Sequence, residues 1–288
     1  MAGKGQFINS DGAKIYLVAV GQKQDEEIDI IEAALAFACL ADEKVDMQKY
    51  RDFIDNMISD LHKTYDDMAA KRNGDDVHIQ AEALAAVMAE KYAFIGDDIH
   101  YDDSKNINLC HVIDRHLGLP ITLSILAIGI CRSCGWAAEG VNFPGHFIMR
   151  LEKDGDRVMI DPFQGCKILE AKDMRLILKR IMGEYAELSA SYYEPCTNRE
   201  MLLRLQNNMK YRLIDNEDYE GALGVVEKMV WVAPQDHRLC LDKAVLLARL
   251  DQPKAAIENL VTYIDAVQDP YDKAEAEQFL FQLQKQLN

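Results

Sequence analysis

Residues 118–151 read GLPITLSILAIGICRSCGWAAEGVNFPGHFIMRL, and residues 158–165 read VMIDPFQG. The first of these segments overlaps an uncharged apolar run, 117–131, that is too short for the ~20 residues needed to span a bilayer. We therefore expect a buried core helix. Pro120 opens this helix, because the missing N–H of a proline is harmless in a first turn, and Gly135 ends it.

Segments typical of β-strands follow the core helix. A hairpin-type turn at 153–156 separates the last two of them, and the strands are expected at 136–143, 147–151 and 157–160. A helix followed by antiparallel strands predicts an α+β core in a mostly helical chain. If the strands pair through this turn, His146 and Asp161 lie within hydrogen-bonding reach. A carboxylate beside a histidine fixes the imidazole tautomer, which is the orienting half of a nucleophilic triad.

The run from Asn106 to Asp161 resembles the transglutaminase-like core of the bacterial SirB family, which is similar to the papain-like transglutaminase fold. The residues that carry the resemblance are the GLPI opening at 118–121, GVNFPGHF at 140–147 and DPF at 161–163. The resemblance implies an N-terminal helical region and C-terminal tetratricopeptide-like helices, so that it covers residues 28–285. It also implies that His146 and Asp161 match the His and Asp of a transglutaminase core.

The sequence departs from active transglutaminases at the start of the core helix, where they carry a cysteine. Pro120 and its neighbours occupy that place here, and Cys131 and Cys134 lie at the other end of the helix. A rise of 1.5 Å per residue puts these thiols roughly 15 Å from the expected nucleophile. Ordinary papain-like catalysis is therefore not expected. Cys110 is predicted to be a core residue.

Three weaker nucleophile candidates remain near the predicted site. Thr122 and Ser124 carry hydroxyls at the helix start, which a histidine base can activate, and Cys166 follows the DPF turn. The alternative is that the hydroxyls cap or pack the helix and that His146 and Asp161 form a buried pair that pins two strands. Both interpretations stay open at this point.

The region before the core is predicted to be helical. Apolar residues recur at helical spacing from Ile28 onward, over 47–70 and over 77–92, with a break at Asn73-Gly74. A strand is expected at 15–20. The loop 96–108 carries four aspartates around His100 but lacks EF-hand spacing, so we expect a turn that caps the next helix rather than a metal site.

The last third of the chain repeats with a period of 34 residues. This shift aligns Leu205 with Leu239 and Ala222 with Ala256. A 34-residue helix–turn–helix period with small residues at the tight crossing is typical of tetratricopeptide repeats. We expect two units and a final helix at 272–287, packed on the preceding domain because so few repeats make a weak solenoid.

Composition and charge exclude several classes of protein. The 288 residues carry a net charge of -16, of which -13 falls on residues 25–105, and 49% are hydrophobic. So acidic and apolar a chain is neither disordered nor a binder of nucleic acid, which needs a basic face. Seven scattered cysteines, no secretory leader and no membrane span predict a cytoplasmic protein.

The predicted organisation has three parts. Residues 1–24 form an extension, residues 25–195 form the transglutaminase-like domain, and residues 196–288 form the repeat. Within the second part, an acidic helical subdomain at 25–105 precedes the His/Asp core at 106–195.

Two functions follow from this organisation. The first is a non-enzymatic scaffold that binds a protein or peptide through the C-terminal repeat, with no metal, cofactor, nucleic acid or membrane. The alternative is a papain-like hydrolase or acyltransferase acting on an amide or ester. In that case His146 is the base, Asp161 orients it, and Thr122, Ser124 or a displaced cysteine is the nucleophile.

Overall fold

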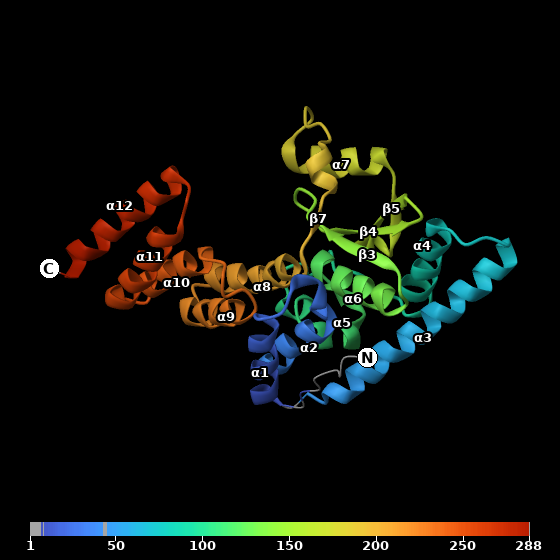
Figure 1. Ribbon diagram of the computed structural model, residues 1–288, viewed down its shortest axis with the longest axis horizontal. Helices are drawn as coiled ribbons and strands as arrows, with labels where there is room; N and C mark the ends of the chain where they lie inside the picture. Colours follow the sequence, from blue (N-terminus) through green and yellow to red (C-terminus); the bar gives the residue numbers. More distant parts are fainter. Residues whose placement is uncertain (1–6, 8, 43–44, 288) are drawn as a thin grey trace. The chain divides into compact units, whose positions relative to one another are not determined.

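The computed structural model describes residue 7 and residues 9–42 and 45–287 (Figure 1). It comprises two compact units, a larger one of Met1–Tyr16 with Gln24–Leu202 and a smaller one of Leu17–Lys23 with Leu203–Asn288. Residues 1–6 and 8 of the predicted N-terminal extension lie outside the described residues.

A five-stranded antiparallel sheet forms the centre of the larger unit. Its strand order is β6-β5-β4-β3-β7. The strands are β3 (Ala137–Val141), β4 (Ile148–Lys153), β5 (Asp156–Asp161), β6 (Lys167–Leu169) and β7 (Pro195–Cys196). The three predicted strands are confirmed as β3, β4 and β5. The sequence did not predict β6 and β7, because strands of two or three residues are too short to show a periodic pattern.

Helices cover both faces of this sheet. The core helix α6 (Pro120–Ser133) is buried along almost its whole length and packs on β3 and β4, as predicted. Gly135 follows it with φ +79°. Helix α7 (Ala171–Met182), which lies on the other side of the sheet in Figure 1, adds Met174 and Leu178 to an apolar cluster with Val141, Phe143 and Ile148.

The acidic region folds into helices, as predicted. They are η1 (Asp25–Glu27), α2 (Ile30–Ala41), α3 (Met47–Arg72), α4 (Val77–Ala85) and the π-helical turn η2 (Ala86–Lys91). Aspartate side chains cap α2, α3 and α4 by accepting hydrogen bonds from first-turn N–H groups. Asn73 ends α3 in the left-handed region at φ 48°, which confirms the predicted break.

The predicted strand at 15–20 is wrong, because residues 10–20 form helix α1 (Ser10–Val20). Ala13, Leu17 and Val20 are spaced by four and three residues and are 0% exposed, whereas Ile15, two residues from Leu17, is 71% exposed. A strand would bury alternate residues on one face, so the observed burial follows the helical period.

The smaller unit is helical and matches the predicted repeat. Its helices are α8 (Asn198–Asp215, which begins in the larger unit), α9 (Tyr219–Val232), α10 (Arg238–Arg249), α11 (Pro253–Ala266) and α12 (Pro270–Leu287). Ala222 and Ala256, which the 34-residue shift aligns, are both 0% exposed. Pro270 opens the final helix two residues before its predicted start.

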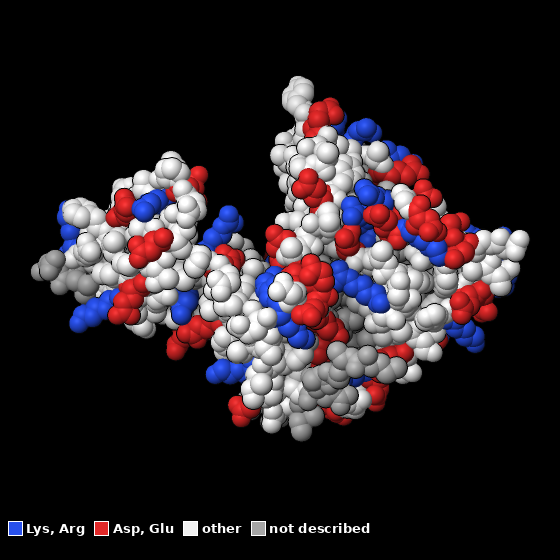
Figure 2. Space-filling view, in the orientation of Figure 1, with Lys and Arg blue, Asp and Glu red and all other residues white. Residues whose placement is uncertain are grey.

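No helix among the described residues is long and apolar enough to cross a membrane. Figure 2 shows acidic and basic side chains mixed on the visible face of the larger unit, without one continuous basic surface.

Candidate functional site

The sheet brings His146 and Asp161 together, as the hairpin predicts. Antiparallel pairing of Met149 with Ile160 aligns the start of β4 with the end of β5. His146 precedes β4 and Asp161 is the last residue of β5, and the His146 Nε2 lies 2.8 Å from the Asp161 Oδ2. The backbone turns into this position at Gly145, whose φ is +66°.

Asp161 is fully buried and accepts three hydrogen bonds. Besides the imidazole, the Phe163 N–H donates to Oδ1 at 3.0 Å and the Gln164 Nε2 donates to Oδ2 at 2.9 Å. Both donors lie in the short helix η4 (Pro162–Gln164), which begins directly after Asp161. The carboxylate is therefore fixed and can orient the imidazole, whose side chain is 15% exposed. Gln164 is not predicted from the sequence, although its spacing of three residues from Asp161 is a local signal for such a contact.

Pro120, at the position where the resemblance to transglutaminases predicts the nucleophile, is the first residue of α6. The Thr122 hydroxyl is buried and donates to the Asn106 carbonyl at 2.9 Å, so its proton is already engaged. Ser124 is also buried, and within the described residues its hydroxyl has no hydrogen-bond partner. Both side chains lie in the core of the unit. This position agrees with the packing role that is the alternative to a nucleophile.

Burial keeps four thiols of this unit protonated. It raises the pKa of Cys166 and of Cys110 to about 12 and that of Cys134 to about 11. Cys131, which is 0% exposed, has its pKa raised well above the ordinary value by the same cause. Since the thiolate is the nucleophilic form, these four cysteines lack the environment that activates a catalytic thiol.

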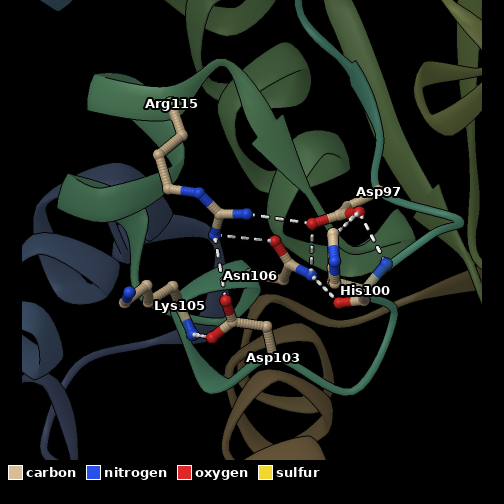
Figure 3. Close-up of polar contacts among 6 residues, drawn as sticks. All are labelled: Asp97, His100, Asp103, Lys105, Asn106 and Arg115. Carbon is tan, nitrogen blue, oxygen red and sulfur yellow. Dashed lines mark hydrogen bonds and ion pairs between the residues drawn. The ribbon is translucent and has the colours of Figure 1, made fainter.

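The aspartate loop before α5 (Leu109–Arg115) forms a polar network rather than a metal cage (Figure 3). Asp97 accepts hydrogen bonds from the His100 N–H at 2.9 Å, from Arg115 Nη2 at 2.9 Å and from Asn106 Nδ2 at 3.2 Å. These contacts, the His100 N–H first, hold the pKa of the Asp97 carboxyl below its ordinary value. Within the described residues, no three His, Cys, Asp or Glu side chains are grouped to hold a metal ion. The cap of α5 comes from Asn108, not from an aspartate of the loop.

This loop reaches both the core helix and the His/Asp pair. The Asn106 carbonyl accepts the Leu119 N–H at 3.2 Å as well as the Thr122 hydroxyl, which fixes the start of α6. The rings of Tyr101 and His146 both meet Phe163 edge-on, each with a centroid distance of 6.0 Å. Phe163 also packs directly on Gly96. This glycine belongs to the strand β1 (Ile95–Gly96), which pairs with β2 (Leu117–Gly118).

This geometry of a core helix packed on an antiparallel sheet agrees with the comparisons between the chain and known proteins. A family model described as the transglutaminase-like superfamily matches residues 48–207, more than half of the sequence. The chain belongs to the transglutaminase-like superfamily. A tetratricopeptide repeat model matches residues 209–283 of this superfamily member, which confirms the predicted C-terminal repeat.

Bacterial relatives extend over most of the chain. A UPF0162 protein of Xylella fastidiosa is 25% identical over 246 residues, which cover 83% of this chain and 84% of the relative. Protein SirB1 of Salmonella typhimurium is 25% identical over 187 residues, 65% of this chain and 69% of that protein. These matches confirm the resemblance to the SirB family.

Relatives also occur in eukaryotes, in much longer proteins. F-box only protein 21 of Mus musculus is 26% identical over 145 residues, which are 46% of this chain and 22% of that protein. No solved structure matches the chain.

Proposed function

We propose that this transglutaminase-like protein is a non-enzymatic scaffold that binds a protein or peptide through its tetratricopeptide helices. The observation that carries the proposal is Pro120 in the first turn of α6, where the resemblance to active transglutaminases implies a cysteine nucleophile. A proline has no side-chain proton or lone pair for covalent catalysis, and the His146/Asp161 pair then serves to join β4 and β5.

The repeat offers a surface suited to a partner. Tyr211 in α8 and Val245 in α10 are 34 residues apart and therefore occupy equivalent positions in consecutive repeats. Both are exposed large side chains, at 58% and 43%. Stacked repeats present such positions as one extended binding surface, and aromatic anchors are typical of protein interfaces.

The test compares proteins captured from an extract of the source organism by the wild-type chain and by the double variant Tyr211→Ala/Val245→Ala. A partner that is held by the repeat is expected to be lost with this variant. The matched control is Phe281→Ala, because Phe281 is exposed to 58% in α12 but lies outside the two aligned helices. Equal capture by all three proteins would show that the aligned surface does not bind the partner.

The alternative, an amide or ester hydrolase or acyltransferase, is favoured by one observation. Asp161 is held by three hydrogen bonds in the arrangement that orients a catalytic histidine. Turnover of activated esters and amides is to be measured for the wild type and for His146→Ala. Turnover that His146→Ala abolishes, with an unchanged circular dichroism spectrum, would refute the scaffold proposal, whereas no turnover above the buffer rate supports it.

A further inference from the structure

The larger unit contains an open groove of about 1200 Å³ that the His/Asp pair does not line. Its walls are η1 with the start of α2, the last turn of α6, the start of β3, the β4–β5 turn and residues 195–198. His146 and Asp161 lie at the other end of β4 and β5, beyond strands of six residues. The groove is therefore separate from the candidate catalytic pair, and every residue that lines it belongs to the larger unit.

The arginine and lysine side chains that line the groove already have hydrogen-bond or ion-pair partners. Arg132 donates from Nε to the Ala138 carbonyl at 2.8 Å and from Nη1 to the Asn198 Oδ1 at 2.7 Å. Arg157 pairs with Glu152 at 2.9 Å, and Arg150 pairs with Glu139. Lys153, the fourth lining cation, pairs with Asp75. A ligand anion would have to break these contacts to reach a positive charge.

Carboxylates outnumber cations in the groove, and some of them have no counter-charge. The seven lining acids are Asp25, Glu26, Glu27, Asp29, Glu139, Glu152 and Asp154, against four lining bases. Glu26 and Asp154 come from two different walls and are exposed, and within the described residues neither side chain has a hydrogen bond or ion pair. The charge of the groove therefore complements a cationic ligand.

The exposed edge of β3 limits how such a ligand can bind. Strand β7 pairs only with Gly140 and Val141, so residues 137–139 have no strand partner on that side in the part of the chain that the structure describes. At this edge the Arg132 guanidinium donates a hydrogen bond to the Ala138 carbonyl. Burial lowers the pKa of this guanidinium. Since the side chain blocks strand addition, the ligand must be recognised through contacts between its cations and the groove carboxylates.

We infer that this groove binds a lysine- or arginine-bearing peptide segment of a partner protein. Its volume accommodates several extended residues, and the carboxylates of Glu26 and Asp154 each accept one cationic side chain. This site lies in the transglutaminase-like unit and does not depend on the tetratricopeptide surface proposed above.

The test measures the fluorescence anisotropy of fluorescein-labelled hexalysine with the full chain in about 0.15 M salt, where the Debye length is about 8 Å. The groove variant is Glu26→Gln/Asp154→Asn. Asparagine tolerates the positive φ of position 154, which is 53°, so the turn is retained. We expect the affinity to fall about fivefold, because the variant removes both unpaired carboxylates from the groove.

The matched control, Glu258→Gln/Glu277→Gln, removes the same two charges from exposed positions of α11 and α12. Its affinity is expected to stay within about twofold of the wild type, because its charges lie outside the groove. Equal losses in both variants would reveal non-specific attraction to an acidic protein and overturn the proposal. Unchanged binding in the groove variant would also overturn it. Spermine that binds the groove in place of hexalysine would assign the site to polyamines instead.

Discussion

Asp161 illustrates how one buried side chain can hold several segments. Its carboxylate joins His146, two residues before β4, to the end of β5 and to the helix η4 through three donors. Replacing Asp161 by alanine would leave these donors without an acceptor inside the protein. A buried unsatisfied polar group costs ~1–3 kcal/mol, so the contact is structural whether or not it is catalytic.

We predict that Asp161→Ala lowers the free energy of unfolding by about 3 kcal/mol or more, because three donors lose their acceptor. Asp161→Asn keeps one carbonyl oxygen and should lower it by less. Urea unfolding of both variants measures the difference. The control is Asp156→Ala at the exposed start of the same strand, which should change stability by less than ~0.5 kcal/mol. A loss of that small size for Asp161→Ala would contradict the structural role.

A second prediction concerns Cys166, whose pKa is raised to about 12 by burial and by the Asp161 charge. A thiol whose pKa is raised by folding contributes its full stabilisation of the folded state at pH values below its pKa in the unfolded chain, ~8.5. This stabilisation is lost as the pH rises from that value to the pKa in the folded state. The free energy of unfolding should therefore fall from pH 8.5 to 10.5. The free energy of unfolding of the Cys166→Ala variant should fall less steeply with pH, by up to ~1.4 kcal/mol per pH unit. Parallel curves for the two proteins would contradict the assignment.

At the residue scale, the sequence predicted the meeting of His146 and Asp161 because two strands and one tight turn determine their distance. It could not decide among Thr122, Ser124 and Cys166. Their roles depend on burial, and that of Thr122 depends also on the Asn106 carbonyl, 16 residues away; no local pattern reveals either.

At the scale of elements, long periodic helices were predictable and short elements were not. The core helix α6 and the long helix α3 carry start and stop signals at both ends, so their bounds follow from the sequence. The apolar run in helix α1 is too short to distinguish a helix from a strand by its pattern. Only the burial of Leu17 and Val20 in the folded chain shows the helical period.

Close packing of α6 on α2 gives a third prediction. A Cβ on Gly129 would overlap the Ile31 side chain, so Gly129→Ala should lower stability by ~1–3 kcal/mol through overpacking. Ile31→Ala alone leaves a cavity, but in the Gly129→Ala background it also removes the overlap. Unfolding of both single variants and the double variant by urea should therefore reveal a coupling of at least ~1 kcal/mol. Additive losses would mean that the two side chains do not meet.

At the scale of the whole molecule, charge is distributed unevenly along the chain. The net charge is -16, and residues 25–105 carry -13 of it. Many of these acids have local roles as helix caps and loop acceptors, such as Asp29, Asp76 and Asp97. The composition alone excluded a basic binding face, but it did not reveal the acidic groove, because that groove is assembled from segments far apart in the sequence.

Self-repulsion of this charge gives the fourth prediction. Raising the salt concentration from about 0.01 M to about 0.15 M shortens the Debye length from about 30 Å to about 8 Å, so that repulsion between distant carboxylates weakens. The midpoint of thermal unfolding should therefore rise. Repetition with KCl in place of NaCl checks that the effect is screening rather than binding of one cation. A midpoint that falls with both salts would show that surface ion pairs outweigh the repulsion.

The π-helical turn η2 lies next to Gly165, in the turn that follows Asp161. The Tyr92 N–H donates to the Val87 carbonyl at 2.9 Å, five residues back, so this turn holds one residue more than a regular α-helix needs. Ala89 in this turn faces Gly165, where an added Cβ would lie 3.5 Å from the Ala89 Cβ. Deleting one residue between Ala86 and Lys91 would restore a regular helix and rotate this face by about 100°. In this chain, such a deletion would therefore take the Ala89 side chain away from the turn that follows Asp161.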